Sequence, residues 1–133
     1  MLRLFSPRLQ KSKSKARPVG DKPQWVFDKD TLRFLEVNDS AILSYGYTRE
    51  EFLKMTIRDI RPPFDVPKLD RQIAAHYGNP TYQDAWKHRK KNGDILFVLV
   101  SSQQGNFNGV PAWFVTITDL TPTLTRHSKN YGG

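Results

Sequence analysis

The sequence predicts an α+β domain in which short helices pack on one face of a five-stranded antiparallel sheet. Two strand-like segments open the folded part, and several short helical segments follow them. From residue 81 onward the hydrophobic period changes to two, which is typical of long antiparallel strands. Strands at both ends of the domain with helices between them indicate helices gathered on one side of a sheet.

The positive charge of the chain is concentrated at its ends. The protein has 133 residues and a net charge of +8, which is enough chain for one domain with tails. Residues 1–23 carry a net charge of +6, whereas residues 24–121 carry twelve basic and twelve acidic side chains. A neutral body is a poor binder of duplex nucleic acid, because that affinity depends on phosphate neutralisation. A protein that binds nucleic acid through the basic N-terminal arm is therefore kept only as a third functional hypothesis, after the two given at the end of this section.

The two ends of the chain are expected to lie outside the folded domain. Residues 1–23 are polar and cationic, and we expect a flexible tether in which Leu2, Phe5 and Leu9 could form a small cap on the domain. The N-terminus has no signal-peptide pattern, and no apolar run approaches the roughly 20 residues that span a bilayer. With no cysteine in the chain, a cytoplasmic location is the expectation.

Two short strands and a capped helix begin the domain. Strands are predicted at residues 24–28 and 33–37, separated by a turn at residues 28–30. Asn38 is a natural N-cap for the helix that follows. Three apolar residues line one face of that helix, namely Ala41, Ile42 and Tyr45.

The corner between the first two helices carries three agreeing signals. Gly46 can close a helix in the left-handed conformation. Thr48 and Glu51 form a capping box, and Tyr47 and Phe52 have the spacing of a hydrophobic staple. We therefore predict a helix end at Gly46 and a helix start at Thr48.

A single helical turn and a longer helix follow the corner. Thr56 is the expected cap of the turn at residues 57–60, and two prolines terminate it. Asp65 is the expected cap of the longer helix, and Gly78 is expected to end it. The buried face of the longer helix is predicted to consist of Leu69, Ile73 and either His76 or Tyr77.

Three long strands complete the sheet. Strands at residues 81–91 and 94–104 are joined by Asn92-Gly93, a strong hairpin signal. A second turn at residues 106–109 leads to the last strand, at residues 110–119.

The middle strand is apolar at every position from Ile95 to Val100. A half-exposed antiparallel strand should alternate, so both of its faces are expected to be covered. The helices cover one face, and either the N-terminal segment or a second copy of the chain covers the other. The residues predicted for this dimer or cap surface are Phe97, Leu99, Trp113 and Val115.

In order and spacing, these segments closely resemble a PAS domain of the bacterial sensor type. The resemblance covers residues 24–121 and is carried by segments 25–28, 34–38, 45–52, 57–65, 86–93 and 119–121. It departs mildly from the usual pattern at Phe64, where an acidic residue is common, and at Leu120, where isoleucine is commoner. The resemblance implies a five-stranded sheet around a small pocket. Such a domain either binds a ligand or cofactor in the pocket or serves only as a dimerisation module.

The resemblance also implies signal relay to a C-terminal effector, such as a histidine kinase or a cyclic-dinucleotide enzyme. The relay segment would be Asp119-Leu120-Thr121, with Thr121 as the cap of an output helix that begins at Pro122. Residues 122–133 would then be the start of that helix or a tail. Ligand-pocket candidates are the apolar residues on inward faces: Ile42, Tyr45, Leu53, Ile60, Ile73, Val98 and Val100.

The leading functional hypothesis is a PAS input domain that senses a small ligand or a partner, and the alternative is a stand-alone dimerising module without ligand. The chain has no cysteine, which excludes cysteine-adduct flavin photochemistry. Haem, for which His76 would be the ligand, and non-covalent flavin are left open but not favoured. The three histidines have no metal-site spacing, so no metal is predicted. No catalytic constellation can be named, and no enzymatic activity is predicted for the domain itself.

Overall fold

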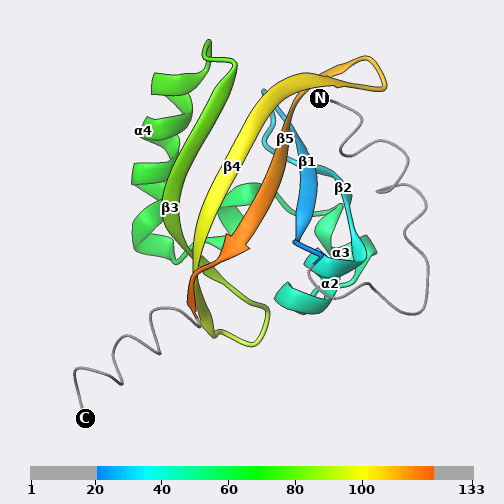
Figure 1. Ribbon diagram of the computed structural model, residues 1–133, viewed down its shortest axis with the longest axis vertical. Coiled ribbons are helices and arrows are strands. Elements are labelled where there is room, and N and C mark those ends of the chain that lie inside the picture. The colour runs from blue at the N-terminus through cyan, green and yellow to red at the C-terminus, as the bar shows by residue number, and fades with distance from the viewer. Residues whose placement is uncertain (1–20, 122–133) are drawn as a thin grey trace.

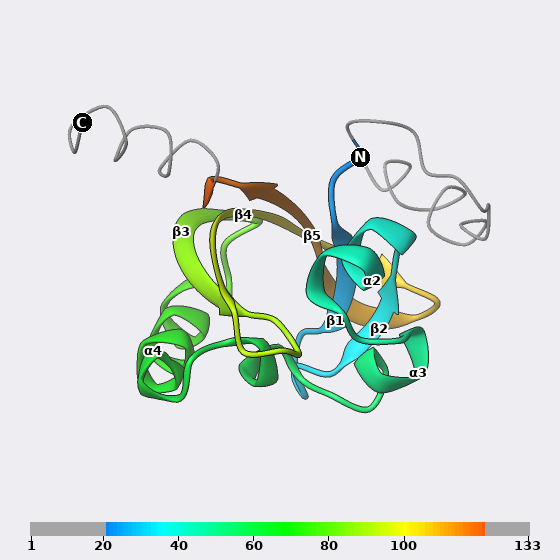
Figure 2. The same cartoon turned by 90° about the horizontal axis from the view of Figure 1, so that it is seen from below.

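The computed structural model describes residues 21–121, which form one antiparallel sheet with helices on one side. The strand order is β2-β1-β5-β4-β3, so the first and last strands of the domain are central neighbours. Figure 2 shows the sheet arching over the helices. The predicted α+β class with a five-stranded antiparallel sheet is therefore confirmed.

The elements follow each other in the predicted order (Figure 1). The strands are β1 (Gln24–Asp28), β2 (Phe34–Val37), β3 (Thr81–Arg89), β4 (Ile95–Phe107) and β5 (Val110–Asp119). The α-helices are α2 (Asp39–Tyr45), α3 (Arg49–Phe52) and α4 (Val66–His76). Two 3-10 turns, η2 (Ile57–Ile60) and η3 (Pro63–Asp65), lie between α3 and α4.

Local capping chemistry sets the ends of the short helices. The Asn38 side chain accepts a hydrogen bond from the backbone N–H of Ala41 at 2.9 Å, which caps α2. Gly46 closes α2 with a φ of 86°, and its N–H donates to the carbonyl of Ile42. Because a φ of this sign strains any residue with a Cβ, glycine is the natural choice here. The predicted helix end at Gly46 is confirmed.

The predicted capping box is also present. Thr48 Oγ1 accepts from the N–H of Glu51 at 3.1 Å, and the Glu51 carboxylate accepts from the N–H of Thr48 at 2.8 Å. The rings of Tyr47 and Phe52 lie 5.5 Å apart, as the hydrophobic staple requires. Thr56 caps η2 in the same way. These contacts fix the path of the chain between β2 and α4.

The predicted limits of α4 agree closely with the observed ones, but neither predicted capping interaction forms. Asp65 occupies the N-cap position but its side chain makes no capping hydrogen bond. Gly78 does not adopt a positive φ, and α4 ends at His76 before it. The prediction relied on residue type alone, whereas η3 and the proline at residue 67 already shape the start of the helix.

The strand predictions hold, with shifted C-terminal ends on β3 and β4. β3 stops at Arg89 rather than residue 91, and β4 runs on to Phe107 instead of residue 104. β4 and β5 pair over ten positions, from Val98↔Asp119 to Phe107↔Val110. Backbone pairing with β5 therefore extends β4 beyond the end of its apolar run, because main-chain hydrogen bonds do not depend on side-chain polarity.

The core lies between the helices and the inner face of the sheet. Its centre is aromatic: the Trp25 ring packs edge-on against Phe34 and Tyr45, with both centroid distances 5.4 Å. Phe52 of α3 completes this group at 5.0 Å from Phe34. Such edge-on pairs contribute about 0.5–1.5 kcal/mol each beyond the burial of their area.

No helix within residues 21–121 combines the length and hydropathy that a membrane crossing requires. The predictions for the N-terminal tether, for Leu2, Phe5 and Leu9, and for residues 122–133 lie outside the described residues. The predicted domain limits of residues 24–121 stay a prediction.

Candidate functional site

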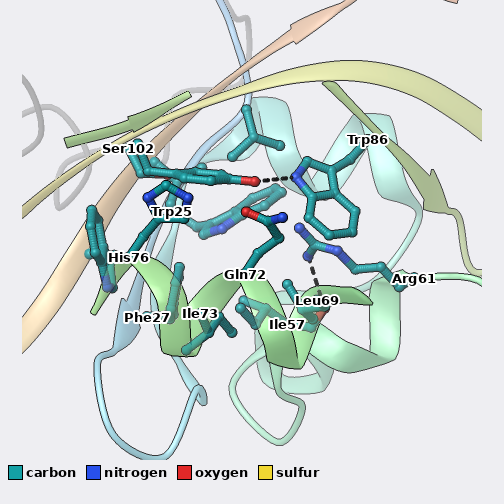
Figure 3. Close-up of a pocket in the computed structure, with 14 residues that line it drawn as sticks. Trp25, Phe27, Ile57, Arg61, Leu69, Gln72, Ile73, His76, Trp86 and Ser102 are labelled. Carbon is teal, nitrogen blue, oxygen red and sulfur yellow. Dashed lines mark hydrogen bonds between the residues drawn. The ribbon is translucent and has the colours of Figure 1, made fainter. Parts of the chain in front are cut away.

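A cavity lies between helix α4, turn η2 and the inner face of the sheet (Figure 3). It offers about 50 Å³ to the centres of water-sized molecules, where a single water needs roughly 10–15 Å³. The cavity therefore has room for a few waters or one small organic molecule. Its lining residues are Trp25, Phe27, Ile57, Arg61, Leu69, Gln72, Ile73, His76, Tyr82, Trp86, Val100, Ser102, Trp113 and Val115.

The periodicities of the surrounding elements place these side chains. On α4, Leu69, Ile73 and His76 are spaced by four and three residues, so they share the face that turns toward the sheet. On β4, Val100 and Ser102 are two residues apart and share the inner face. Tyr77, the alternative to His76 in the prediction, is exposed.

One wall of the cavity is a hydrogen-bonded aromatic pair on β3. The indole N–H of Trp86 donates to the Tyr82 hydroxyl at 2.8 Å. Figure 3 shows this bond, with the Arg61 side chain approaching the Trp86 ring from the helical side. Burial is the main cause that raises the pKa of Tyr82, so its hydroxyl is protonated at neutral pH.

Arg61 is the charged residue of the cavity wall. Its side chain is only 4% exposed, and its Nη1 donates to the carbonyl of Ile57 at 3.0 Å. The guanidinium carbon lies 4.8 Å from the centroid of the Trp86 ring, a cation–π contact. Desolvation lowers the pKa of Arg61 to about 10, which still leaves it charged at neutral pH.

A second buried polar pair lies behind the aromatic core. The Tyr45 hydroxyl and Nδ1 of His88 are hydrogen-bonded at 2.6 Å, and Trp25 packs against both rings. Burial, followed by the nearby Arg61 charge, holds the pKa of His88 well below its ordinary value. Burial also raises the pKa of Tyr45, so both groups of the pair are neutral at pH 7.

The predicted pocket residues fall into three places. Ile73 and Val100 line the cavity. Tyr45 and Val98 line a separate hollow beside Asp119. Ile42, Leu53 and Ile60 belong to the hydrophobic core and line neither space.

The four residues predicted for the dimer or cap surface lie on two different faces of the sheet. Phe97 and Leu99 lie on the outer face of the sheet, and Phe97 is 38% exposed. Trp113 and Val115 are buried on the inner face, where they line the cavity. The correction follows from register, because Trp113 pairs with Phe27 and Val115 with Trp25, both inner residues.

The predicted relay segment is attached to β4. The N–H of Leu120 donates to the carbonyl of Phe97 at 2.7 Å, and the N–H of Phe97 donates to Thr121 Oγ1 at 2.9 Å. The N–H of Thr121 in turn donates to the Asp119 carboxylate at 2.8 Å. The segment that leaves the sheet is therefore held by the same strand that contributes Val100 to the cavity.

Several lining residues were not among the sequence candidates. Trp25 and Trp86 occur in segments that carried the family resemblance, and alternation along the strands could have turned them inward. Arg61 also lies in such a segment, but no alternation marks it as an inward residue, and an arginine beside two prolines is typical of an exposed loop.

The donor groups of the cavity do not favour a metal or a large cofactor. Within residues 21–121, no group of three or more histidine, aspartate or glutamate side chains could hold a metal ion. His76 lines the cavity and its ring contacts Asn79 and Tyr82. The cavity as it stands has no room for the ring system of a haem or a flavin.

Known structures share this architecture, although no model of a protein family and no curated protein sequence matches the chain. A PAS domain from a two-component sensor histidine kinase superposes with a TM-score of 0.66 and 19% identity, over 89% of this chain and 96% of the other. The PAS domain of an HTR-like protein from Haloarcula marismortui has a TM-score of 0.67 and 21% identity, over 89% and 93%.

A third similar structure contains a bound small molecule. It is the PAS domain, in complex with ethanol, of a LuxR-family transcriptional regulator from Burkholderia thailandensis. Its TM-score is 0.64 and its identity 12%, over 77% of this chain and 92% of the other. Together with the strand order and the helices on one face, these similarities identify the folded part of this chain as a domain of the PAS fold.

Proposed function

We propose that the domain is a sensory input module that binds a small ligand in the cavity beneath α4 and relays its occupancy through the end of β5. The observation that carries the proposal is that β4 and β5 both line the cavity and both hold the exit of the chain. Val100 and Ser102 of β4 face the ligand space, and Phe97 of β4 binds Leu120 and Thr121. A ligand that shifts β4 would therefore shift the relay segment.

The cavity has an approach from solvent. Gln72, His76, Tyr82 and Ser102 line both the cavity and an open hollow between α4 and β3. A small molecule could enter at this rim without displacing the sheet. The ethanol complex of a similar PAS domain supports a ligand of this size class.

The proposed output is a C-terminal effector, with a histidine kinase as the leading class. The similarity to a PAS domain of a two-component sensor histidine kinase supports this class. The effector would read the position of Asp119-Leu120-Thr121, where the hydrogen bonds from Phe97 and within the segment hold the backbone.

A second candidate function is dimerisation without a ligand. It is favoured by the outer face of the sheet, where Ile95 and Phe97 are exposed on β4. Exposed large apolar groups on a sheet face are typical of an interaction surface. The two functions are compatible, because the cavity lies on the opposite face of the sheet.

Native mass spectrometry of freshly purified protein tests the ligand. The wild-type chain should carry a non-covalent small molecule that denaturation releases. Ser102→Trp should lose this molecule, because the indole would fill the cavity. Gln103→Trp is the matched control, since Gln103 pairs with Phe114 on the outer face of the sheet and lines neither the cavity nor its entry, so this variant should retain the ligand.

Two results would contradict the proposal. One is a wild-type protein that carries no small molecule under native conditions. The other is a Ser102→Trp variant that is folded and carries the same molecule as the wild type.

A further inference from the structure

The cavity wall contains a buried positive charge without a carboxylate partner. The ion pairs formed within residues 21–121 join Arg49 to Glu36, Arg58 to Asp70 and Lys91 to Glu51, and none includes Arg61. Asp65 acts on Arg61 only through space. Isolated buried charges are costly unless they are paired and hydrogen-bonded, so the environment of Arg61 is incomplete.

The hydrogen bonds of Arg61 are also incomplete. Nη1 reaches the Ile57 carbonyl, but the buried Nε has no hydrogen-bond partner. A guanidinium presents its N–H groups in a planar fork that matches a carboxylate. Figure 3 shows the Arg61 side chain directed toward the space beside Gln72 and Trp86, at the centre of the lining residues.

A second cation strengthens the positive potential at this wall. Lys68 Nζ lies 4.6 Å from the centroid of the Trp86 ring, the same indole that Arg61 contacts. Lys68 makes no ion pair with a described carboxylate. Two cations at one indole favour an anion in the adjoining space.

Other polar groups of the lining are ready to bind a ligand. Neither the Gln72 amide nor the Ser102 hydroxyl makes a side-chain hydrogen bond within the described part of the chain. Both can donate to a carboxylate oxygen. Apart from His76 and Tyr82, the rest of the lining is made by apolar and aromatic side chains, including Ile57, Leu69 and Val115, so it suits a hydrocarbon group better than a fully hydrated ion.

We propose that the cavity binds a short-chain monocarboxylate, whose carboxylate pairs with Arg61 and whose hydrocarbon chain packs among the apolar side chains. The volume of about 50 Å³ sets the size, since it accommodates only a small molecule. The inference rests on the proposed sensory function and names the chemical class of its ligand. Lys68 contributes charge, and Gln72 donates at the cavity mouth.

Calorimetric titration with sodium butyrate and with butan-1-ol tests the charge requirement. The two probes have similar chains and differ in the carboxylate. Before titration, any bound molecule is removed by unfolding and refolding the protein, and sodium chloride keeps the ionic strength constant. Wild-type protein should bind butyrate roughly tenfold or more tightly than butanol, the ratio expected for a hydrogen bond to a charged group.

Variants assign this preference to Arg61. Arg61→Met should bring the two affinities together, whereas Arg61→Lys should retain part of the preference. Lys68→Met serves as a second variant because Lys68 is exposed and its loss should not disturb folding. It should reduce the preference for butyrate without changing butanol binding. Circular dichroism confirms that each variant is folded.

Three results would overturn the carboxylate inference. The first is that the wild type binds butanol as tightly as butyrate. The second is that the wild type binds neither probe. The third is that Lys68→Met and a folded Arg61→Met both keep the full preference for butyrate. The native mass spectrum decides the sensory function separately. A neutral molecule found there would refute the carboxylate and leave the sensory function in place.

Discussion

The backbone N–H of Lys91 donates to the carbonyl of Tyr45 across 2.9 Å, which joins the β3–β4 hairpin to the end of helix α2. The Lys91 side chain adds an ion pair with Glu51 of α3 at 2.8 Å. The corner formed by α2 and α3 is therefore attached to two strands that line the cavity. A change that destabilises this corner should therefore also affect the position of β3 and β4.

Gly46→Ala should lower the free energy of unfolding by about 1–2 kcal/mol, because alanine would have to adopt the left-handed conformation. A Cβ at Gly46 would meet Lys91 Cβ at 3.5 Å, an ordinary contact, so the cost is conformational rather than steric. Urea denaturation measures the change. Gly78→Ala is the control, since Gly78 has no positive φ and open space around it. Equal losses in the two variants would contradict this account of the corner.

Thr48→Ala should destabilise the protein by about 1 kcal/mol, because the N–H of Glu51 loses its acceptor. Thr48→Ser keeps a hydroxyl and should recover most of the loss. Thermal unfolding at one pH compares the three proteins. If the serine variant is as unstable as the alanine variant, the hydroxyl is not the stabilising group.

Stability should fall as the pH drops below the ordinary histidine pKa, because His88 stays neutral in the folded protein. Its folded pKa lies well below the ordinary value, so in that interval the unfolded chain binds more protons. The slope from one such group is at most about 1.4 kcal/mol per pH unit. His88→Gln should therefore show a flatter profile between neutral and mildly acidic pH, measured by urea unfolding.

Tyr45→Phe provides the comparison for that pH profile. It removes the hydroxyl that bonds His88 but leaves the imidazole buried. The variant should be less stable than the wild type at every pH and should keep the wild-type slope. A slope that disappears in Tyr45→Phe and persists in His88→Gln would assign the titration to another group.

Phe97→Lys should weaken self-association if the outer face of the sheet joins two copies of the chain. A lysine ammonium at this position would be desolvated in an apolar interface. Sedimentation velocity measures the monomer fraction over a concentration series. Leu43→Lys is the matched control, because Leu43 on α2 is 64% exposed and lies away from the outer face. A wild type that is monomeric at all concentrations would contradict the dimer.

Short-range chemistry explains which parts of the fold were predictable. Asn38, Thr48 and Thr56 each bond a backbone N–H within three residues, so the sequence alone determines those helix starts. The ends of β3 and β4 depend on pairing across the sheet, and the far end of β4 depends on its pairing with β5. That pairing is not visible in side-chain periodicity, and β4 was predicted too short.

The site depended on contacts between distant parts of the chain. Alternation placed Trp113 and Val115 on one face of β5, but only the register with β1 shows that this face is the inner one. Arg61 is buried because α4 and the Trp86 side of β3 close over it. No local pattern predicts a buried arginine, and the charged residue of the site was therefore missed.

The cavity also has an optical consequence. The chain contains three tryptophans, and all of them, Trp25, Trp86 and Trp113, line this one space. Indole emission responds to the polarity and contacts of its surroundings. The tryptophan fluorescence of the chain thus originates at the walls of the candidate site, and binding or displacement of a ligand can be followed in the unlabelled protein.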